Sequence, residues 1–136
     1  MRILICGNSM YPLIRVRRDY VTILPLKRTP LRGDVVLFSD PHRERYVLHR
    51  VWRIEESRIL TWGDHCAHPD AWIPMDCIWG IAVKVERGKI SLNPDSDVAR
   101  RIGLAFAAAY HPLHRLYLFL RSKAARIYHA LKGDRK

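Results

Sequence analysis

A serine, a histidine and two aspartates in this chain are the residue types that acyl transfer requires. Ser9 lies in GNSMYP, His49 in the apolar run YVLHRVWRI, and Asp64 and Asp70 in the turn-rich segment TWGDHCAHPDAWIP. A serine hydroxyl is a weak nucleophile until a neighbouring base accepts its proton and fixed donors stabilise the oxyanion. Histidine, with an unperturbed pKa of about 6.5, suits that base role near neutral pH. The chain order Ser, His, Asp therefore supplies a nucleophile, a base and a carboxylate to orient the base.

The sequence up to residue 90 has the pattern of a mostly β domain that could position these side chains. Short runs rich in β-branched and aromatic residues alternate with turn segments containing Gly, Pro, Asp and Ser. We expect a mainly β fold class, with a compact domain over residues 1–90, in which Ser9 follows the first strand and His49 lies within a strand. About six strands are expected, near residues 2–6, 19–26, 33–39, 45–54, 58–62 and 78–90.

Residues 95–136 differ in composition and predict a basic amphipathic helical tail. Ser96 or Asp97 can cap a first helix, which Pro112 should break or kink before a second helix begins. The second helix would pack its apolar face on the β domain or a second subunit, or lay it on an anionic membrane surface. Its apolar runs are shorter than the roughly 20 residues that a membrane-spanning helix needs. That face comprises Leu113, Leu116, Tyr117, Leu120, Ile127 and Leu131.

Charge and cysteine content limit the partners and the compartment. The formal net charge of +11 over 136 residues favours anionic partners such as nucleic acid, phospholipid head groups or acidic peptides. Three irregularly spaced cysteines, Cys6, Cys66 and Cys77, do not form a disulfide framework and indicate a reducing compartment. Too few residues precede Ser9 for a secretory signal peptide. The expected location is the cytoplasm or the cytoplasmic face of a membrane, with no N-terminal anchor.

Five sequence blocks in one order resemble the type I signal peptidases, and together they cover nearly all of residues 3–88. The likeness is greatest to the endoplasmic-reticulum and archaeal type, in which a histidine followed by Arg-Val takes the place of a lysine base. The blocks are GNSMYP at residues 7–12, RGDVVLF at 32–38, YVLHRV at 46–51, GDHCAHPD at 63–70 and IWGIAVKV at 78–85.

This resemblance implies a serine endopeptidase that needs no cofactor and cleaves an extended leader or signal-like peptide. Ser9 matches the nucleophile and His49 the general base. Asp70 matches the aspartate that orients the histidine, with Asp64 as a supporting or alternative partner. The backbone N–H of Ser9 would contribute to the oxyanion hole. Gly7 stands where the family often has a serine that assists the oxyanion, and Cys66 stands where the family usually has an asparagine.

The related LexA-like self-cleaving peptidases share the Gly-x-Ser-Met start but use a lysine base. No lysine occurs between Arg28 and Val83, which excludes a Ser-Lys dyad on a mid-domain strand. The expected substrate is a peptide with small residues near the cut, paired with strand edges beside Ser9. Candidate walls for the apolar substrate pockets are Met10, Tyr11, Leu13, Ile14, Tyr46 and Leu48.

Two other functional classes stay open from the sequence. A structural zinc site is one, because potential ligands are dense after residue 63, although their spacing matches no standard finger. A basic module without catalysis is the other, binding nucleic acid or an anionic membrane; nucleic acid is the less expected partner. The potential zinc ligands are Asp64, His65, Cys66, His68, Asp70 and Cys77, and the candidate stacking residues are Trp52, Trp62, Trp72 and Trp79.

Overall fold

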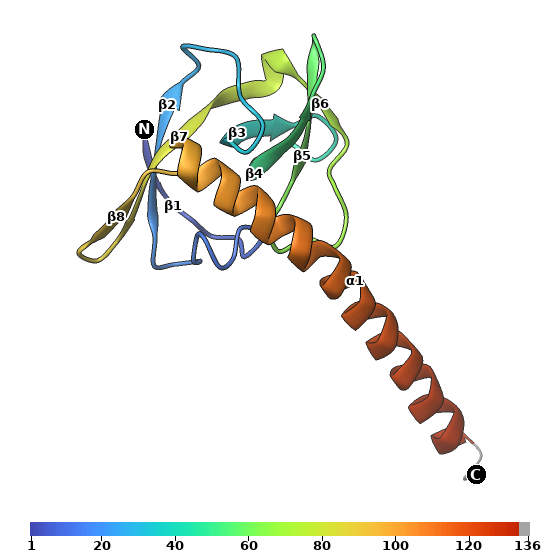
Figure 1. Ribbon diagram of the computed structural model, residues 1–136. Helices are drawn as coiled ribbons and strands as arrows, with labels where there is room; N and C mark the ends of the chain where they lie inside the picture. The colour runs from blue at the N-terminus through green and yellow to red at the C-terminus, as the bar shows by residue number, and fades with distance from the viewer. Residues whose placement is uncertain (134–136) are drawn as a thin grey trace.

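Eight antiparallel strands form one sheet, and a single long helix follows it (Figure 1). The structure is a computed structural model and describes residues 1–133. The strands pair in the order β1-β2-β7-β3-β4-β5-β6, and β8 forms a hairpin with β7. A mainly β fold with a C-terminal helix is thereby confirmed. The strands are β1 (Arg2–Leu4), β2 (Tyr20–Pro25), β3 (Val35–Asp40), β4 (Arg45–Ile54), β5 (Arg58–Trp62), β6 (Trp72–Pro74), β7 (Ile78–Arg87) and β8 (Ile90–Leu92).

The structure has two more strands than the sequence predicted, and both are short. The expected strand over residues 78–90 is divided at Gly88, where a φ of 57° turns the chain from β7 into β8. Strand β6 lies within the turn-rich segment and pairs with β5. The β5–β6 pairing returns the chain toward the sheet, so that the Asp70 N–H donates to the Thr61 carbonyl at 2.9 Å. This bond places Asp70 beside β5.

The apolar core lies on both faces of β3. Val35 and Leu37 belong to one buried cluster, and Val36 and Phe38 belong to another. Alternate side chains of a strand point to opposite faces, so a fully apolar strand separates two cores. The first cluster includes Met10, which is 2% exposed and lies in the turn after β1. Burial of this side chain anchors the segment that carries Ser9.

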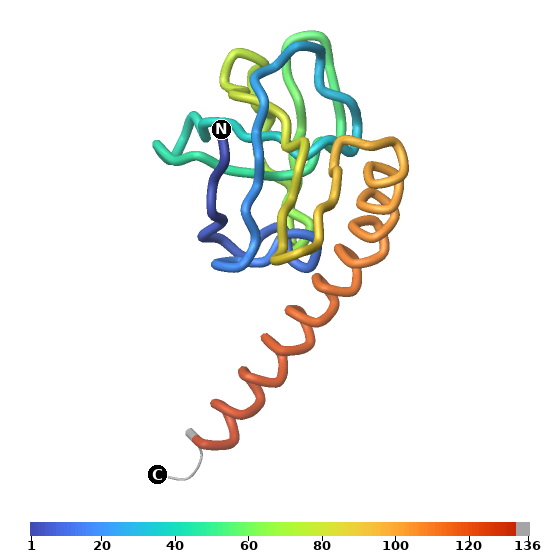
Figure 2. Tube along the Cα trace, turned by 90° about the vertical axis from the view of Figure 1, so that its left-hand side faces the viewer, coloured from blue at the N-terminus to red at the C-terminus, as the bar shows by residue number. Residues whose placement is uncertain are grey.

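Helix α1 (Asp97–Gly133) is continuous, so the predicted break at Pro112 is wrong. Proline lacks the N–H that would bond the Ala108 carbonyl, and this normally disturbs a helix. Here Ala108 and Pro112 are both exposed, so water can bond the freed carbonyl. His111 and His114, on either side of the proline, contact the loop after β5. The second half of α1 extends away from the sheet (Figure 2), and the final residues of the predicted tail, 134–136, lie outside the described residues.

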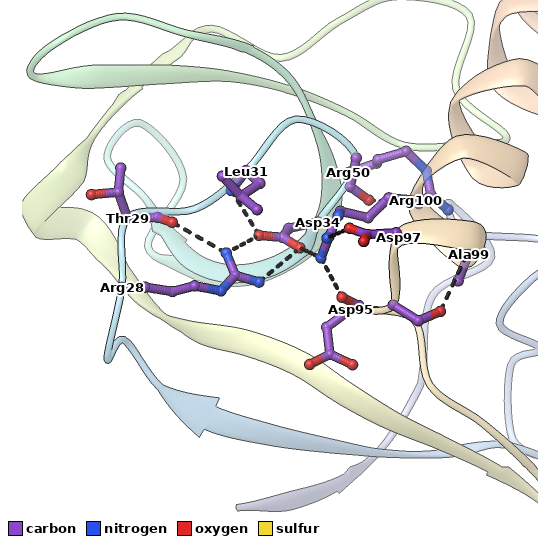
Figure 3. Close-up of polar contacts among 11 residues, drawn as sticks. Arg28, Thr29, Leu31, Asp34, Arg50, Asp95, Asp97, Ala99 and Arg100 are labelled. Carbon is purple, nitrogen blue, oxygen red and sulfur yellow. Dashed lines mark hydrogen bonds and ion pairs between the residues drawn. The ribbon is translucent and has the colours of Figure 1, made fainter.

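The first turns of α1 are tied to the turn before β3 by a network of ion pairs (Figure 3). The buried Asp34 carboxylate accepts two hydrogen bonds from Arg28, at 2.6 and 3.1 Å, and one from Arg100 at 3.2 Å. Arg100 also bonds the Asp95 carbonyl and the Asp97 carboxylate. The guanidinium of Arg100 therefore links the start of the helix to the β domain. In the described part of the chain, no helical stretch is long and apolar enough to cross a membrane.

Candidate active site

Ser9 lies half-buried in the turn that follows β1. An ion pair fixes the remainder of this turn to β7: Arg87 donates two bonds to the buried Asp19 carboxylate, at 2.8 and 2.6 Å. Arg87 also donates to the Leu13 carbonyl at 3.1 Å, and the Arg15 N–H donates to Asp19 at 2.8 Å. The bonds from Arg87 lower the pKa of Asp19. The nucleophile segment is thus held by both apolar burial and charge.

His49 lies in β4 between β3 and β5, and its side chain is buried. Its Nδ1 lies 2.5 Å from an Asp70 carboxylate oxygen. The Thr61 hydroxyl donates to the same oxygen at 2.7 Å, and the Asp70 backbone N–H bonds the Thr61 carbonyl. The carboxylate is therefore held by β5 while it fixes the tautomer and orientation of the ring.

The other ring nitrogen of His49, Nε2, and the backbone of Ser9 both lie close to Gly63. A Cβ added at Gly63 would lie 2.9 Å from His49 Nε2 and 2.8 Å from the Ser9 carbonyl oxygen. The His65 N–H donates to that same carbonyl at 2.8 Å. Only glycine allows this approach, because any larger residue would separate the imidazole from the serine turn. The loop after β5 thus packs closely against both the Ser9 backbone and Nε2.

Cys66 is a neighbour of His49 to which the sequence assigned no catalytic role. The same Cβ position at Gly63 lies 2.6 Å from Cys66 Sγ, so the thiol and Nε2 are close neighbours. The Trp62 indole N–H holds this segment by donating to the Cys66 carbonyl at 2.9 Å. The signal in the sequence was that Cys66 stands where the signal peptidases that the chain resembles usually have an asparagine, and the structure places its sulfur close to the His49 ring.

Burial and charge act in opposite directions on the pKa of His49. Burial lowers the pKa, but the hydrogen bond to Asp70 and the Cys66 sulfur outweigh it and raise the pKa to about 9. At pH 7 a group with that pKa is neutral in about one molecule in a hundred. The resting site therefore holds an imidazolium near neutral pH, and the neutral base becomes common only in alkaline solution.

Ser9 and His49 open onto one cavity of about 600 Å³, together with Cys66 and Asp70. Along one side run residues 3–7, which include part of β1, the terminal strand of the sheet, whose outer edge has no strand partner among the described residues. Such an edge can pair with an extended peptide. Of the predicted pocket walls, Met10, Tyr46 and Leu48 line this cavity, whereas Tyr11, Leu13 and Ile14 lie outside its lining.

Asp64 lies at the other end of the same loop and pairs with Arg50 rather than with His49. Arg50 donates to both carboxylate oxygens, at 2.8 and 2.6 Å, and also to the Gly33 carbonyl at 2.8 Å. Helix α1 covers this pair so closely that a Cβ at Gly103 would lie 2.3 Å from the Arg50 guanidinium carbon. The structure therefore brings Ser9, His49 and Asp70 together and places Asp64 in a separate buried ion pair.

Helix α1 also contacts the loop of the site, which the sequence did not indicate. The Tyr110 hydroxyl lies 2.9 Å from His65 Nδ1, and His111 donates its Nε2–H to the Gly63 carbonyl at 3.2 Å. Burial lowers the pKa of His111, and its ring stacks on Trp62 with centroids 3.8 Å apart. Local periodicity carries no information about these contacts, because they join segments more than 40 residues apart.

The potential zinc ligands do not converge. Among residues 1–133, no group of three His, Cys, Asp or Glu side chains lies close enough together to hold a metal ion. Trp52 and Trp62 lie edge to face and pack against His111, and Trp52 and Trp72 line one pocket, whereas Trp79 lies beside Tyr46.

Comparison with known proteins found no matching protein-family model, no matching curated protein and no matching solved structure.

Proposed function

We propose that the protein is a serine endopeptidase of the signal-peptidase type, with Ser9 as nucleophile, His49 as general base and Asp70 orienting the base. The observation that carries this proposal is the arrangement around one imidazole. Nδ1 lies 2.5 Å from a carboxylate oxygen, Nε2 and the Ser9 backbone both lie close to Gly63, and His49 and Ser9 line one cavity of about 600 Å³. A buried histidine with only a structural role needs neither the cavity nor the serine.

The chemistry follows from the two ring nitrogens. In its neutral form, His49 donates Nδ1–H to Asp70 and can accept the Ser9 hydroxyl proton at Nε2. Peptide binding has to bring Ser9 Oγ within about 2.6–3.2 Å of Nε2. The oxygen then attacks the scissile carbonyl carbon, and the Ser9 N–H stabilises the oxyanion.

The second half of the cycle reverses the proton transfer. The His49 imidazolium gives its proton to the leaving amine as the C–N bond breaks, which leaves an acyl ester on Ser9. A water molecule, deprotonated by the same imidazole, then hydrolyses the ester and restores the hydroxyl. Asp70 stabilises the imidazolium formed in each half-cycle.

The proposed substrate is an extended peptide with small side chains beside the scissile bond. The edge of β1 offers backbone donors and acceptors along the cavity, and the side chains of Met10, Tyr46 and Leu48 limit the space near the site. A leader-like or signal-like peptide has these properties, as the resemblance to signal peptidases implies.

Cleavage of alanine-rich leader peptides tests the proposal. The wild-type protein should cleave them, Ser9→Ala and His49→Ala should abolish cleavage, and Cys66→Ala should retain it as a matched control within the same cavity. Loss of activity in Cys66→Ala with retention in Ser9→Ala would make the thiol the nucleophile. A folded wild-type protein that cleaves none of these peptides would favour the alternative, a non-catalytic basic binding module.

A further inference from the structure

One side of helix α1 carries an exposed apolar surface along most of its length, here called the α1 stripe. At about 3.6 residues per turn, the residues of the stripe share one side of the helix. They are well exposed in both halves: Ile102 is 64% exposed, Leu113 64% and Leu131 67%. From Val98 to Leu131 the stripe is about 50 Å long, taking 1.5 Å per residue. It comprises Val98, Ile102, Phe106, Leu113, Leu116, Tyr117, Leu120, Ile127 and Leu131.

The face of α1 that packs on the β domain is a different one. Gly103, Ala107 and His111 are buried against the sheet and the loop after β5, and Arg100 is bonded to Asp34. On a helix with 100° between residues, these positions lie about a quarter of a turn or more from the centre of the stripe. The contact between helix and domain therefore uses small and polar residues and leaves the apolar side uncovered along both halves of the helix.

The charges beside the stripe are all of one sign. From Val98 to Gly133 every residue carrying a full charge is Arg or Lys, and the sequence of this segment contains no Asp or Glu. By helical position they lie on both sides of the stripe in the projecting half of the helix. The basic residues are Arg100, Arg101, Arg115, Arg121, Lys123, Arg126 and Lys132.

We propose that the α1 stripe binds the surface of an anionic phospholipid bilayer, with the helix lying in the interfacial plane. Apolar side chains would enter the boundary between head groups and acyl chains, while the flanking Arg and Lys contact anionic head groups. Two copies joined along their stripes would bring like charges together without any acidic residue to offset them. A nucleic acid would satisfy the charge but leave the apolar side chains in water.

An apolar cavity next to the stripe extends this surface onto the β domain. Val98, Ile102 and Phe106 line a cavity of about 490 Å³ whose opposite wall includes Leu13 and Leu92. The exposed apolar surface therefore continues from the helix toward β8. A bilayer seated on the stripe would meet the domain on this side, which would fix the orientation of the domain on the membrane.

The test is cosedimentation of the full chain with vesicles of phosphatidylcholine alone and of phosphatidylcholine mixed with phosphatidylserine. The Ser9→Ala form can be used throughout, so the result does not depend on catalysis. We expect binding to the anionic vesicles at least tenfold tighter than to the neutral ones, and weaker at high salt. The triple variant Leu116→Asn, Leu120→Asn, Ile127→Asn should lower binding at least tenfold, with helix content checked by circular dichroism.

Leu118→Asn is the matched control, because Leu118 lies on the same half of the helix but away from the stripe, and binding should stay within about twofold of the starting protein. Equal binding to neutral and anionic vesicles, or no effect of the triple variant, would overturn the proposal. So would a stripe-dependent dimer in the absence of lipid, or stripe-independent binding to nucleic acid in place of vesicles.

Discussion

Asp64 and Asp70 stand at the two ends of one loop and have opposite surroundings. The Asp64 side chain is 1% exposed and is paired with an equally buried Arg50, under helix α1. The Asp70 side chain is 25% exposed, borders the cavity of the candidate site and is paired with His49. The two residues have the same chemical group and lie six positions apart in sequence. Their difference comes entirely from the partner and from access to the cavity.

The partner determines what each carboxylate can do. A guanidinium keeps its charge throughout the physiological range, so the Asp64–Arg50 pair has one state and acts as a structural element. An imidazole gains and loses a proton, so the Asp70–His49 pair has two states that a substrate in the cavity can use. The two pairs can be separated by experiment, because the proposed catalysis depends on the Asp70–His49 pair and not on the Asp64–Arg50 pair.

The largest expected effect is the loss of catalysis when Asp70 is replaced. Asp70→Asn should lower kcat/KM for a cleaved peptide by about 10³–10⁴-fold, because an amide cannot stabilise the imidazolium and favours the wrong tautomer. Steady-state kinetics measure this directly. An Asp64→Asn protein that remains folded should keep its kcat/KM within about tenfold, and the reverse pattern would exchange the two roles.

The second largest effect is the loss of folding stability when Asp64 is replaced. Asp64→Asn should lower the free energy of unfolding by about 3–5 kcal/mol, because it leaves the Arg50 guanidinium buried without a counter-charge. Urea denaturation gives the value. If Asp70→Asn proves the more damaging of the two to stability, the assignment of Asp64 as the structural carboxylate fails.

Because His49 gains and loses a proton, both the free energy of unfolding and kcat/KM should depend on pH. The folded pKa of about 9 lies above the unfolded value of about 6.5, so this stabilisation is complete below pH 6.5 and is lost as the pH rises through 9. The loss should be about 3 kcal/mol in urea denaturation and should be smaller in Asp70→Asn, in which only the Cys66 sulfur still raises the pKa of His49. Over the same range kcat/KM should rise about tenfold per pH unit, because the neutral base becomes more populated. A His49 pKa near 6.5 in an NMR titration would refute both expectations.

The smallest predicted effect is a rise in kcat/KM without a change in folding stability. A Cβ at Gly7 would meet no other atom within 4 Å, so a serine side chain fits there without displacing a neighbour. Gly7→Ser supplies a hydroxyl at the position where the signal peptidases that the sequence resembles often have one, and kcat/KM should rise about tenfold, with unchanged urea stability. Gly7→Ala is the control for added bulk, and an equal gain in both variants would exclude a role for the hydroxyl.

Strongly patterned strands were predictable from the sequence, whereas contacts made by the helix were not. The expected strands at residues 45–54 and 58–62 agree with β4 and β5, because long runs of β-branched and aromatic residues specify a strand locally. Strand β6 has only three residues and owes its existence to pairing with β5. Helix α1 continues through Pro112, and the exposure of Ala108 lets water bond the freed carbonyl. The sequence pattern around Pro112 does not show whether Ala108 is exposed.

The candidate site likewise combines residues that the sequence identified with contacts that it could not predict. Residue types and order selected Ser9 and His49, and the choice of Asp70 over Asp64 depended on the resemblance to a family rather than on spacing. The pairing of Asp64 with Arg50 and the approach of Cys66 to His49 are consequences of how the loop folds over Gly63. Such contacts depend on tertiary packing and cannot be derived from periodicity along the chain.

The most direct test of the account is covalent labelling by a serine-reactive fluorophosphonate at pH 9, read by intact mass and peptide mapping. We predict a single adduct on Ser9 that is absent in Ser9→Ala and strongly reduced in His49→Ala and Asp70→Asn, and that persists in Cys66→Ala. Cleavage of a leader peptide at the same pH should follow the same order of variants. A folded wild-type protein that shows neither an adduct nor cleavage, or an adduct that maps to Cys66, would contradict the assignment of Ser9 as the nucleophile.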